Sequence, residues 1–219
     1  MKRIAIAAVA ILVAAGLAYA GYGLYQKRAL RAQVAQTVDA ASARLIGSLG
    51  ADLAAPTATL VEQLDRDSEE TDAALQGLRS APARSERPLV EAADAYVGNV
   101  LAVLKRQDGS ARGRLRFADS RKALAEHMAR VGRRNEDWSD TAIRLKERLD
   151  ADYFEYRIAT TSLGNMLGEL PAARARIAAL LPQARLPQEA AIKDARARAL
   201  SAAEATRLEF EQAKQLVPR

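Results

Sequence analysis

The side chains that most often carry acid–base or metal chemistry are sparse in this chain. His127 is the only histidine and there is no cysteine, so a nucleophilic triad has one possible base, and neither a thiolate nor a multi-histidine metal site can be built. A di-iron bundle needs a Glu-x-x-His pair on each of two helices, which one histidine excludes. We therefore expect no catalytic residue, no metal and no cofactor, and we interpret His127 as an ordinary residue at the edge of a helix seam.

Carboxylates cluster once, in the sequence DRDSEETD at residues 65–72. On a helix these side chains point over several faces instead of converging on one ion, and the glycine-bearing turn of a calcium loop is missing. The sequence also contains no glycine-rich phosphate loop and no G-x-S-x-G nucleophile elbow. The pattern indicates a protein that is not an enzyme, with this acidic run on a solvated helix face.

The segment DADYFEYR, residues 150–157, places aromatic rings next to opposite charges. Charged groups beside rings can hold the polar ends and the body of a small aromatic or amino-acid ligand. Aromatic residues at helical spacing are also typical of a packed core, which is the first interpretation here. The candidate residues of a ligand site, the second interpretation, are Asp152, Tyr153, Tyr156 and Arg157.

The sequence KRQDGSARGRLRFADSRK, residues 105–122, carries seven basic side chains and two acidic ones. The letters DGS within it predict a turn, which would make the cluster an exposed connector between two helices. Arg112, Arg114 and Arg116 could then contact an anionic partner, such as an acidic protein or an envelope surface. The alternative is a solvated connector in an arginine-rich chain.

The first 26 residues are typical of a targeting segment. Lys2 and Arg3 precede IAIAAVAILVAAGLAYAGYGLY, an uncharged run about as long as a helix needs to cross a bilayer. The letters AYA before Gly21 would also suit cleavage of an export signal. The run stays uncharged and rich in tyrosine before Lys27 and Arg28, as at the interface of a retained membrane helix. We expect a single-pass signal anchor, with cleaved export as the second choice.

A short cationic leader normally stays on the cytoplasmic side of the membrane. We therefore expect the protein in the cytoplasmic (inner) membrane with its body in the periplasm or outside, and a cytoplasmic body is the least favoured arrangement. No second apolar run of eighteen residues follows, unlike in two-span receptors. The net charge of +6 is spread over a mixed surface, which argues against a nucleic-acid partner.

Beyond residue 26, apolar residues recur at steps of three and four, which predicts an all-α body. The strongest pattern covers residues 119–170, where we expect one continuous helix about 75 Å long. Gly132 is the place where this helix could break, but the register continues past it. Two interleaved heptad series carry the pattern, with Asn135 and Asp152 as their polar members: Leu124, Val131, Trp138, Leu145, Asp152, Ala159 and Met166; and Met128, Asn135, Ala142, Leu149, Tyr156, Leu163 and Leu170.

Shorter helices are expected on either side of this one. One leaves the membrane and ends near residue 54, one begins with a Thr59–Glu62 capping box, one begins at Pro88, and a last one ends near Leu216 after a stretch divided by Pro171, Pro182 and Pro187. Their predicted inward faces are Leu30, Val34, Val38, Ala41, Leu45 and Leu49; Leu60, Leu64, Ser68, Thr71, Leu75 and Leu78; Leu89, Ala93, Tyr96, Val100 and Val103; and Ile192, Ala195, Ala199, Ala202, Thr206, Phe210 and Ala213.

These patterns predict an elongated antiparallel helical bundle, coiled-coil-like, on one N-terminal transmembrane helix. Residues 1–26 would be the signal anchor or signal peptide, and residues 27–219 one extracytoplasmic bundle domain. The function expected from this architecture is an interaction or scaffold protein that packs its helices against a protein partner or itself. The alternative is a sensory bundle that binds a small molecule.

Overall fold

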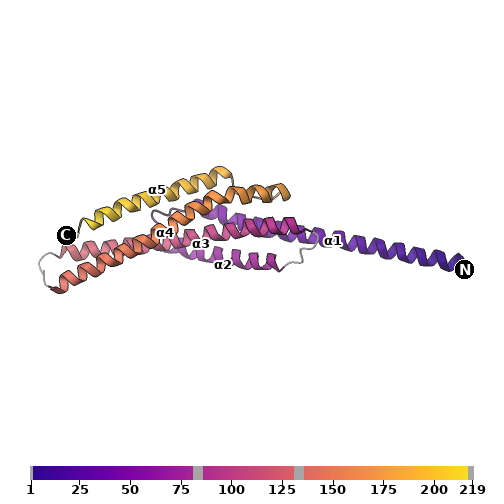
Figure 1. The fold of residues 1–219 in the computed structure, drawn as a ribbon, viewed down its shortest axis with the longest axis horizontal. Helices are drawn as coiled ribbons and strands as arrows, with labels where there is room; N and C mark the ends of the chain where they lie inside the picture. The colour runs from indigo at the N-terminus through magenta and orange to yellow at the C-terminus, as the bar shows by residue number, and fades with distance from the viewer. Residues whose placement is uncertain (1, 81–85, 131–135, 217–219) are drawn as a thin grey trace.

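The computed structural model describes residues 2–80, 86–130 and 136–216, with side chains described from residue 24 onward except at Glu136. It contains the helices α1 (Lys2–Leu49), α2 (Ala58–Arg79), α3 (Arg87–Ala129), α4 (Glu136–Leu180) and α5 (Glu189–Lys214) (Figure 1). No strand occurs within these ranges, so the predicted all-α class is confirmed.

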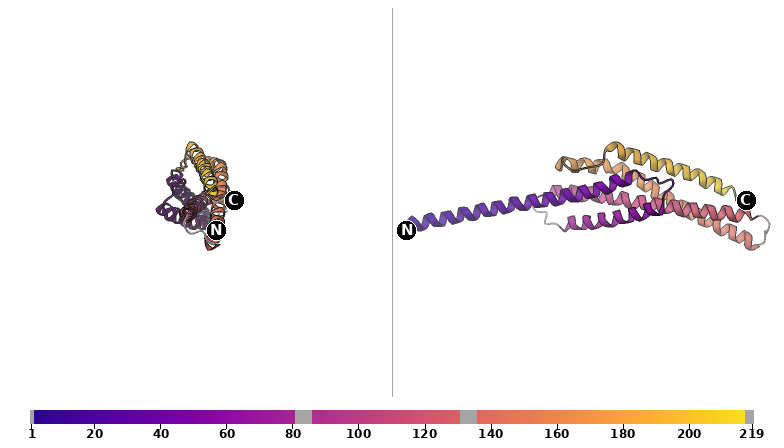
Figure 2. Two further views of the ribbon diagram at one scale, coloured as in Figure 1. Left: turned by 90° about the vertical axis from the view of Figure 1, so that its left-hand side faces the viewer. Right: turned by 180° about the vertical axis from the view of Figure 1, so that it is seen from behind.

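The helices lie side by side in an elongated bundle. α3 and α4 form the central antiparallel pair, α2 packs on α3, and α5 packs mainly on α4. The second half of α1 joins the bundle beside α2 and α3, whereas its first half extends beyond the other helices (Figure 2). The two ends of the chain therefore lie at opposite ends of the molecule.

Two hydrophobic cores follow one another along the bundle axis. The first, which we call the proximal core, contains residues of all five helices and includes the fully buried Leu45, Leu64, Leu104 and Leu167. The distal core lies between α3, α4 and α5 alone and consists of Phe117, Leu124, Leu149, Tyr153, Phe210 and Ala213. α3, α4 and α5 are long enough to contribute to both cores.

The proximal core also encloses a tyrosine. The hydroxyl of Tyr96 lies 2.8 Å from Ser42 Oγ, which connects α3 to α1. Burial raises the pKa of Tyr96 to about 12, because the phenolate would lose its hydration inside the bundle. The hydrogen bond to Ser42 opposes this shift only in part.

The predicted inward faces agree closely with the buried residues. All the positions predicted for α1, α3 and α5 are buried. On α2 every predicted position but one is buried, and Val61 lies inward where Leu60 was expected. The helical period identified these faces because each of these helices turns one apolar side toward its neighbours.

The prediction of one continuous helix over residues 119–170 is wrong. α3 ends at Ala129, where the Arg130 backbone leaves helical geometry with φ −82° and ψ 56°, and α4 runs back along α3. Heptad positions 131 and 135 lie outside the described residues. The periodicity extends across the break because each helix of an antiparallel pair turns its own apolar seam toward the other. Within α4 one of the two predicted series is confirmed, because Ala142, Leu149, Tyr156, Leu163 and Leu170 are all buried. The α4 members of the other series, from Trp138 to Met166, are only half-buried.

Three helix boundaries also differ from the predictions. Thr57, not Thr59, caps α2, because its extended backbone lets Oγ1 accept the Leu60 amide at 3.1 Å. α1 ends at Leu49, not near residue 54. Pro171 does not separate two segments but lies inside α4, which continues to Leu180. The missing Pro171 amide costs a helical hydrogen bond, and burial of the flanking Leu170 and Ala173 offsets that cost.

Residues 2–26 of the segment predicted as the anchor form part of the same continuous helix as the bundle residues of α1. In the part of the chain that the structure describes, no helix has a stretch long and apolar enough to cross a bilayer. The side chains of residues 1–23, on which the prediction mainly depends, lie outside that part.

Candidate functional site

The predicted basic connector is in fact the middle of α3. Residues 105–122 are helical throughout, so the exposed turn expected there is wrong. Ser110 and Gly113 are buried against α4, and this packing overrides the local turn preference of the letters DGS. The approach is close, since a Cβ atom on Gly113 would lie 3.0 Å from Tyr156 Cα.

Two of the three arginines from this cluster are half exposed and form ion pairs within the chain. Arg112 lies 2.8 Å from Asp108 one turn earlier and 3.3 Å from Asp65 on α2. The hydrogen bond to Asp108 raises the pKa of the Arg112 guanidinium. Arg116 lies 2.5 Å from Glu155 on α4. Their role in contacting an anionic partner stays a prediction.

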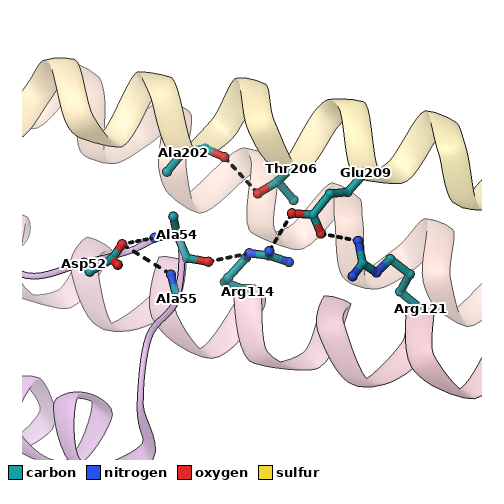
Figure 3. A network of polar contacts seen from close by, with 8 residues as sticks. All are labelled: Asp52, Ala54, Ala55, Arg114, Arg121, Ala202, Thr206 and Glu209. Atoms are coloured by element: carbon teal, nitrogen blue, oxygen red, sulfur yellow. Dashed lines mark hydrogen bonds and ion pairs between the residues drawn. The ribbon is translucent and has the colours of Figure 1, made fainter.

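Arg114 is the most enclosed of the three, with 13% of its side chain exposed. Its Nε donates to the carbonyl oxygen of Ala54 at 2.9 Å, and its Nη2 donates to Glu209 on α5 at 2.8 Å. Arg121 donates to the other carboxylate oxygen of Glu209 at 2.6 Å (Figure 3). This network connects the loop between α1 and α2 to α5 through α3.

Asp152, the first of the predicted ligand-binding residues, faces α3. It accepts a hydrogen bond from Ser120 Oγ, and it lies 3.9 Å from Arg116 and 3.8 Å from Arg148. Its side chain is 13% exposed. These contacts satisfy the carboxylate within the bundle.

The aromatic residues of the predicted ligand site belong to the core. Tyr153 stacks on Phe210 of α5 with ring centroids 3.9 Å apart, and Tyr156 is 1% exposed. Arg157 lies on the outer face instead, with its guanidinium 4.9 Å from the Phe154 ring. The structure therefore brings Asp152, Tyr153 and Tyr156 inward without Arg157, and neither cavity described below is lined by any of the four.

His127 connects the two long helices where α3 ends. Its Nε2 lies 2.9 Å from the carbonyl oxygen of Trp138, and its ring stacks on the Trp138 indole with centroids 5.0 Å apart. This is the packing expected of a residue at the edge of a seam. Within the described ranges, no three or more acidic or histidine side chains are grouped so that they could hold a metal ion.

The site that best fits a ligand lies near the boundary of the two cores, where α1 ends. A cavity of about 280 Å³ lies between the loop after α1, Gln107 of α3, Leu163 and Leu167 of α4, and one face of α5. We call it the junction cavity. A second cavity of about 470 Å³ shares Leu49, Gly50 and Arg198 with it and opens toward the segment before α5.

Two side chains cap the end of α1 beside this cavity. Gln107 Nε2 donates to the Ser48 carbonyl oxygen at 3.2 Å, and Arg198 Nη2 donates to the Leu49 carbonyl oxygen at 2.7 Å. Helix ends leave such carbonyl groups without partners of their own. Gln107 is 2% exposed, and its Oε1 has no hydrogen-bond partner among the described residues.

The loop that closes the cavity is held by side chains as well. Asp52 Oδ1 accepts the backbone N–H groups of Ala54 and Ala55 at 2.9 and 3.3 Å, which folds the loop into a tight turn. Arg114 holds the next carbonyl group, that of Ala54 (Figure 3). The loop that forms this wall of the cavity is therefore held both by Arg114 of α3 and by its own residue Asp52.

The sequence analysis missed this site for physical reasons. Gln107 fell inside the segment assigned to a connector, and Arg198 occupies an unremarkable exposed position beside the alanine seam of α5. The small side chains of that seam leave space where a neighbouring helix stops, as α1 does at Leu49. Neither a family model, nor a curated protein, nor a solved structure matches this chain.

Proposed function

We propose that this protein is a scaffold anchored in the cytoplasmic membrane by α1, with its bundle in the periplasm or outside, which acts by packing its helices against a protein partner or a second copy. The path of α1 is the observation that carries the proposal. Leu30 is the first described residue of α1 that is buried, and residues 24–29 are exposed as the helix leaves the bundle (Figure 2).

The exposed part of α1 includes Leu24 and Tyr25, which are 61% and 70% exposed. Large apolar side chains on a lone helix gain free energy when a lipid interface or a partner covers them. The uncharged sequence that precedes Leu24 favours a lipid interface over a partner protein. Because the helix does not break at the bundle, an anchor there would hold the body at a defined angle.

The long helices would carry the distal core away from the membrane. α3 alone is about 65 Å long by its helical rise. The start of α3 and the end of α4 lie on the side from which α1 projects, and the end of α3 lies at the other (Figure 1). Such a body presents its long sides to other proteins to a greater extent than it presents either of its ends.

One side of α4 carries the apolar residues that fit a partner. Ile143, Phe154 and Ile158 are 53%, 45% and 64% exposed. Their spacing of eleven and four residues places them on one face of the helix. Charged neighbours such as Glu155 and Arg157 surround this face, as polar groups surround an interface core. The α4 face, as we call these three residues, would accept a partner helix.

A photo-crosslinking amino acid placed at Phe154 tests the proposal in cells that express the full chain. We expect a crosslinked adduct in the membrane fraction, with a mass that tells a second copy from another protein. The matched control places the same group at Glu69, an exposed position on α2. Equal adducts from both positions, or none from Phe154, would contradict a specific partner at the α4 face.

A sensory bundle that binds a small molecule is the second candidate function. The junction cavity favours it, because Gln107 offers a buried acceptor there, whereas residues 152–157 pack into the core or face outward.

A further inference from the structure

We propose that the junction cavity binds a free aliphatic α-amino acid. This inference goes beyond the scaffold function and depends on neither the anchor nor the α4 face. Its first support is the shape of the site, which is enclosed mainly by apolar side chains of α4, α5 and the loop, among them Leu53, Leu163, Leu167 and Ala199. A volume of about 280 Å³ lies at the small end of ligand pockets, which suits a short branched side chain.

The second support is a pair of opposite charges in the lining. Arg198 donates to a backbone carbonyl group, and Asp52 accepts two backbone N–H groups. Neither side chain forms an ion pair with another described residue, although every guanidinium of the Arg114 network has a carboxylate. A cation and an anion that are both open to one cavity match a zwitterion, with its carboxylate on Arg198 and its ammonium on Asp52.

The third support is the unpartnered Oε1 atom of Gln107. Its orientation is fixed, because turning the amide over would bring Oε1 against the Ser48 carbonyl oxygen in place of the donor Nε2. A buried acceptor without a partner is unfavourable, because it has given up its hydrogen bonds to water. An ammonium group has three donors and can therefore serve Asp52 and Gln107 together.

The positions of these groups agree with a ligand of this size. Gln107 and Arg198 bind the carbonyl groups of Ser48 and Leu49, which are consecutive in one helical turn. Asp52 follows three residues later in the loop. Gln107 and Arg198 therefore hold the end of α1, and Leu163 and Leu167 of α4 line the same cavity as apolar neighbours for an aliphatic side chain.

Calorimetric titration of the detergent-solubilised full chain tests this assignment. L-Leucine should bind, and it should raise the thermal unfolding midpoint. Leucinamide lacks the carboxylate and 4-methylpentanoate lacks the ammonium, so each should bind at least about tenfold more weakly, as for a lost charge-assisted hydrogen bond. No binding of L-leucine at millimolar concentration, or equal binding of the three compounds, would overturn the proposal.

Two substitutions separate the roles of the charges. Asp52→Asn keeps an oxygen for the turn but removes the charge, so leucine should bind at least about tenfold more weakly while 4-methylpentanoate is unaffected. Arg198→Gln should weaken the binding of both leucine and 4-methylpentanoate, because both carry a carboxylate. Arg196→Gln is the control, because Arg196 lies on the same helix but against Gly168 and outside the cavity lining.

The substitutions also keep the test decisive if one of them destabilises the bundle. The thermal midpoint of each variant without ligand shows whether its fold is retained, and Asp52→Asn serves alone if Arg198→Gln unfolds the end of α1. Unchanged leucine affinity in a folded Asp52→Asn variant would show that the charge pair does not recognise a zwitterion. Membrane retention and crosslinking at Phe154 would be unaffected by that result.

Discussion

Gly113 is the glycine at which α3 and α4 leave the least room for a side chain. Its neighbours across the interface are backbone and Cβ atoms of Tyr156, which cannot move aside as the end of a flexible side chain could. A side chain at this position would push the helices apart between the two cores. The same helix contains Gly98, around which a Cβ atom would meet nothing within 4 Å.

Alanine substitutions at these two glycines should therefore have opposite effects. Gly113→Ala should lower the free energy of unfolding by about 1–3 kcal/mol, because the interface is overpacked. Gly98→Ala should raise it by up to about 1 kcal/mol, because alanine favours the helix. Urea unfolding followed by circular dichroism measures both. Similar stabilisation by the two changes would show that α3 and α4 are not this close.

Glu209 binds two arginines of α3. Removing its charge should therefore lower the free energy of unfolding more than removing the charge of a surface carboxylate. In Glu209→Gln, Arg114 and Arg121 lose a charged acceptor, which should cost about 1–2 kcal/mol of unfolding free energy. The control is Glu204→Gln on the same helix, where the pair with Arg207 is exposed and local and removal should have little effect. Chemical unfolding in low and high salt checks the comparison, and equal losses would contradict the network.

Tyr96 should make stability depend on alkaline pH. Its pKa is raised from an ordinary value of 10.0 to about 12 in the folded chain, so the unfolded chain loses this proton first. The buried Tyr96 should therefore contribute fully to the free energy of unfolding below pH 10, and this contribution should fall as the pH rises toward 12. Unfolding midpoints measured against pH should decline more steeply for the native chain than for Tyr96→Phe. Parallel curves would argue against a buried phenol.

Individual contacts of this kind were beyond the reach of the sequence. The pattern placed Tyr96 and Gly113 on a helix or in a connector, but it could not show that Gly113 meets Tyr156 or that Arg114 reaches the loop before α2. These contacts depend on which helices are neighbours. The position of His127 at a seam edge was local enough to predict.

At the scale of the helices, the period of the sequence predicted nearly all the inward faces. It failed where two helices share one pattern, since the heptads of α3 and α4 continue past Gly132 in apparent register. The chain reverses direction between α3 and α4, and periodicity contains no information about direction. Around Ser110 the local turn residues DGS predicted an exposed connector. This part of α3 is a buried helix instead, because its packing against α4 outweighs the local preference.

A disulfide tests the reversal directly, since the chain has no cysteine. Ser110 Oγ and Thr160 Oγ1 lie 2.8 Å apart, so the variant Ser110→Cys with Thr160→Cys should form an intramolecular disulfide on refolding in an oxidising glutathione buffer. One continuous helix would separate these residues by about 75 Å. Ser110→Cys with Thr141→Cys is the control and should stay reduced, about 29 Å apart along α4. Intact mass before and after thiol labelling gives the result.

The whole molecule is an elongated bundle from which the first part of α1 projects (Figure 2). Amphipathic patterns predicted its elongation. The junction cavity could not be predicted, because it arises where α1 stops inside a bundle that α3, α4 and α5 continue. The same arrangement leaves the first part of α1 without helical neighbours, on which the proposed anchor depends.

We propose above all that α1 holds the intact protein in a membrane. The most direct test of this proposal is the intact mass of the full-length protein recovered from carbonate-washed membranes of a bacterial host. Retention with an unprocessed N-terminus is the expected result, because α1 joins the uncharged segment to the bundle without a break. A protein that begins at Gly21, or that the carbonate wash releases, would contradict the anchor and favour cleaved export.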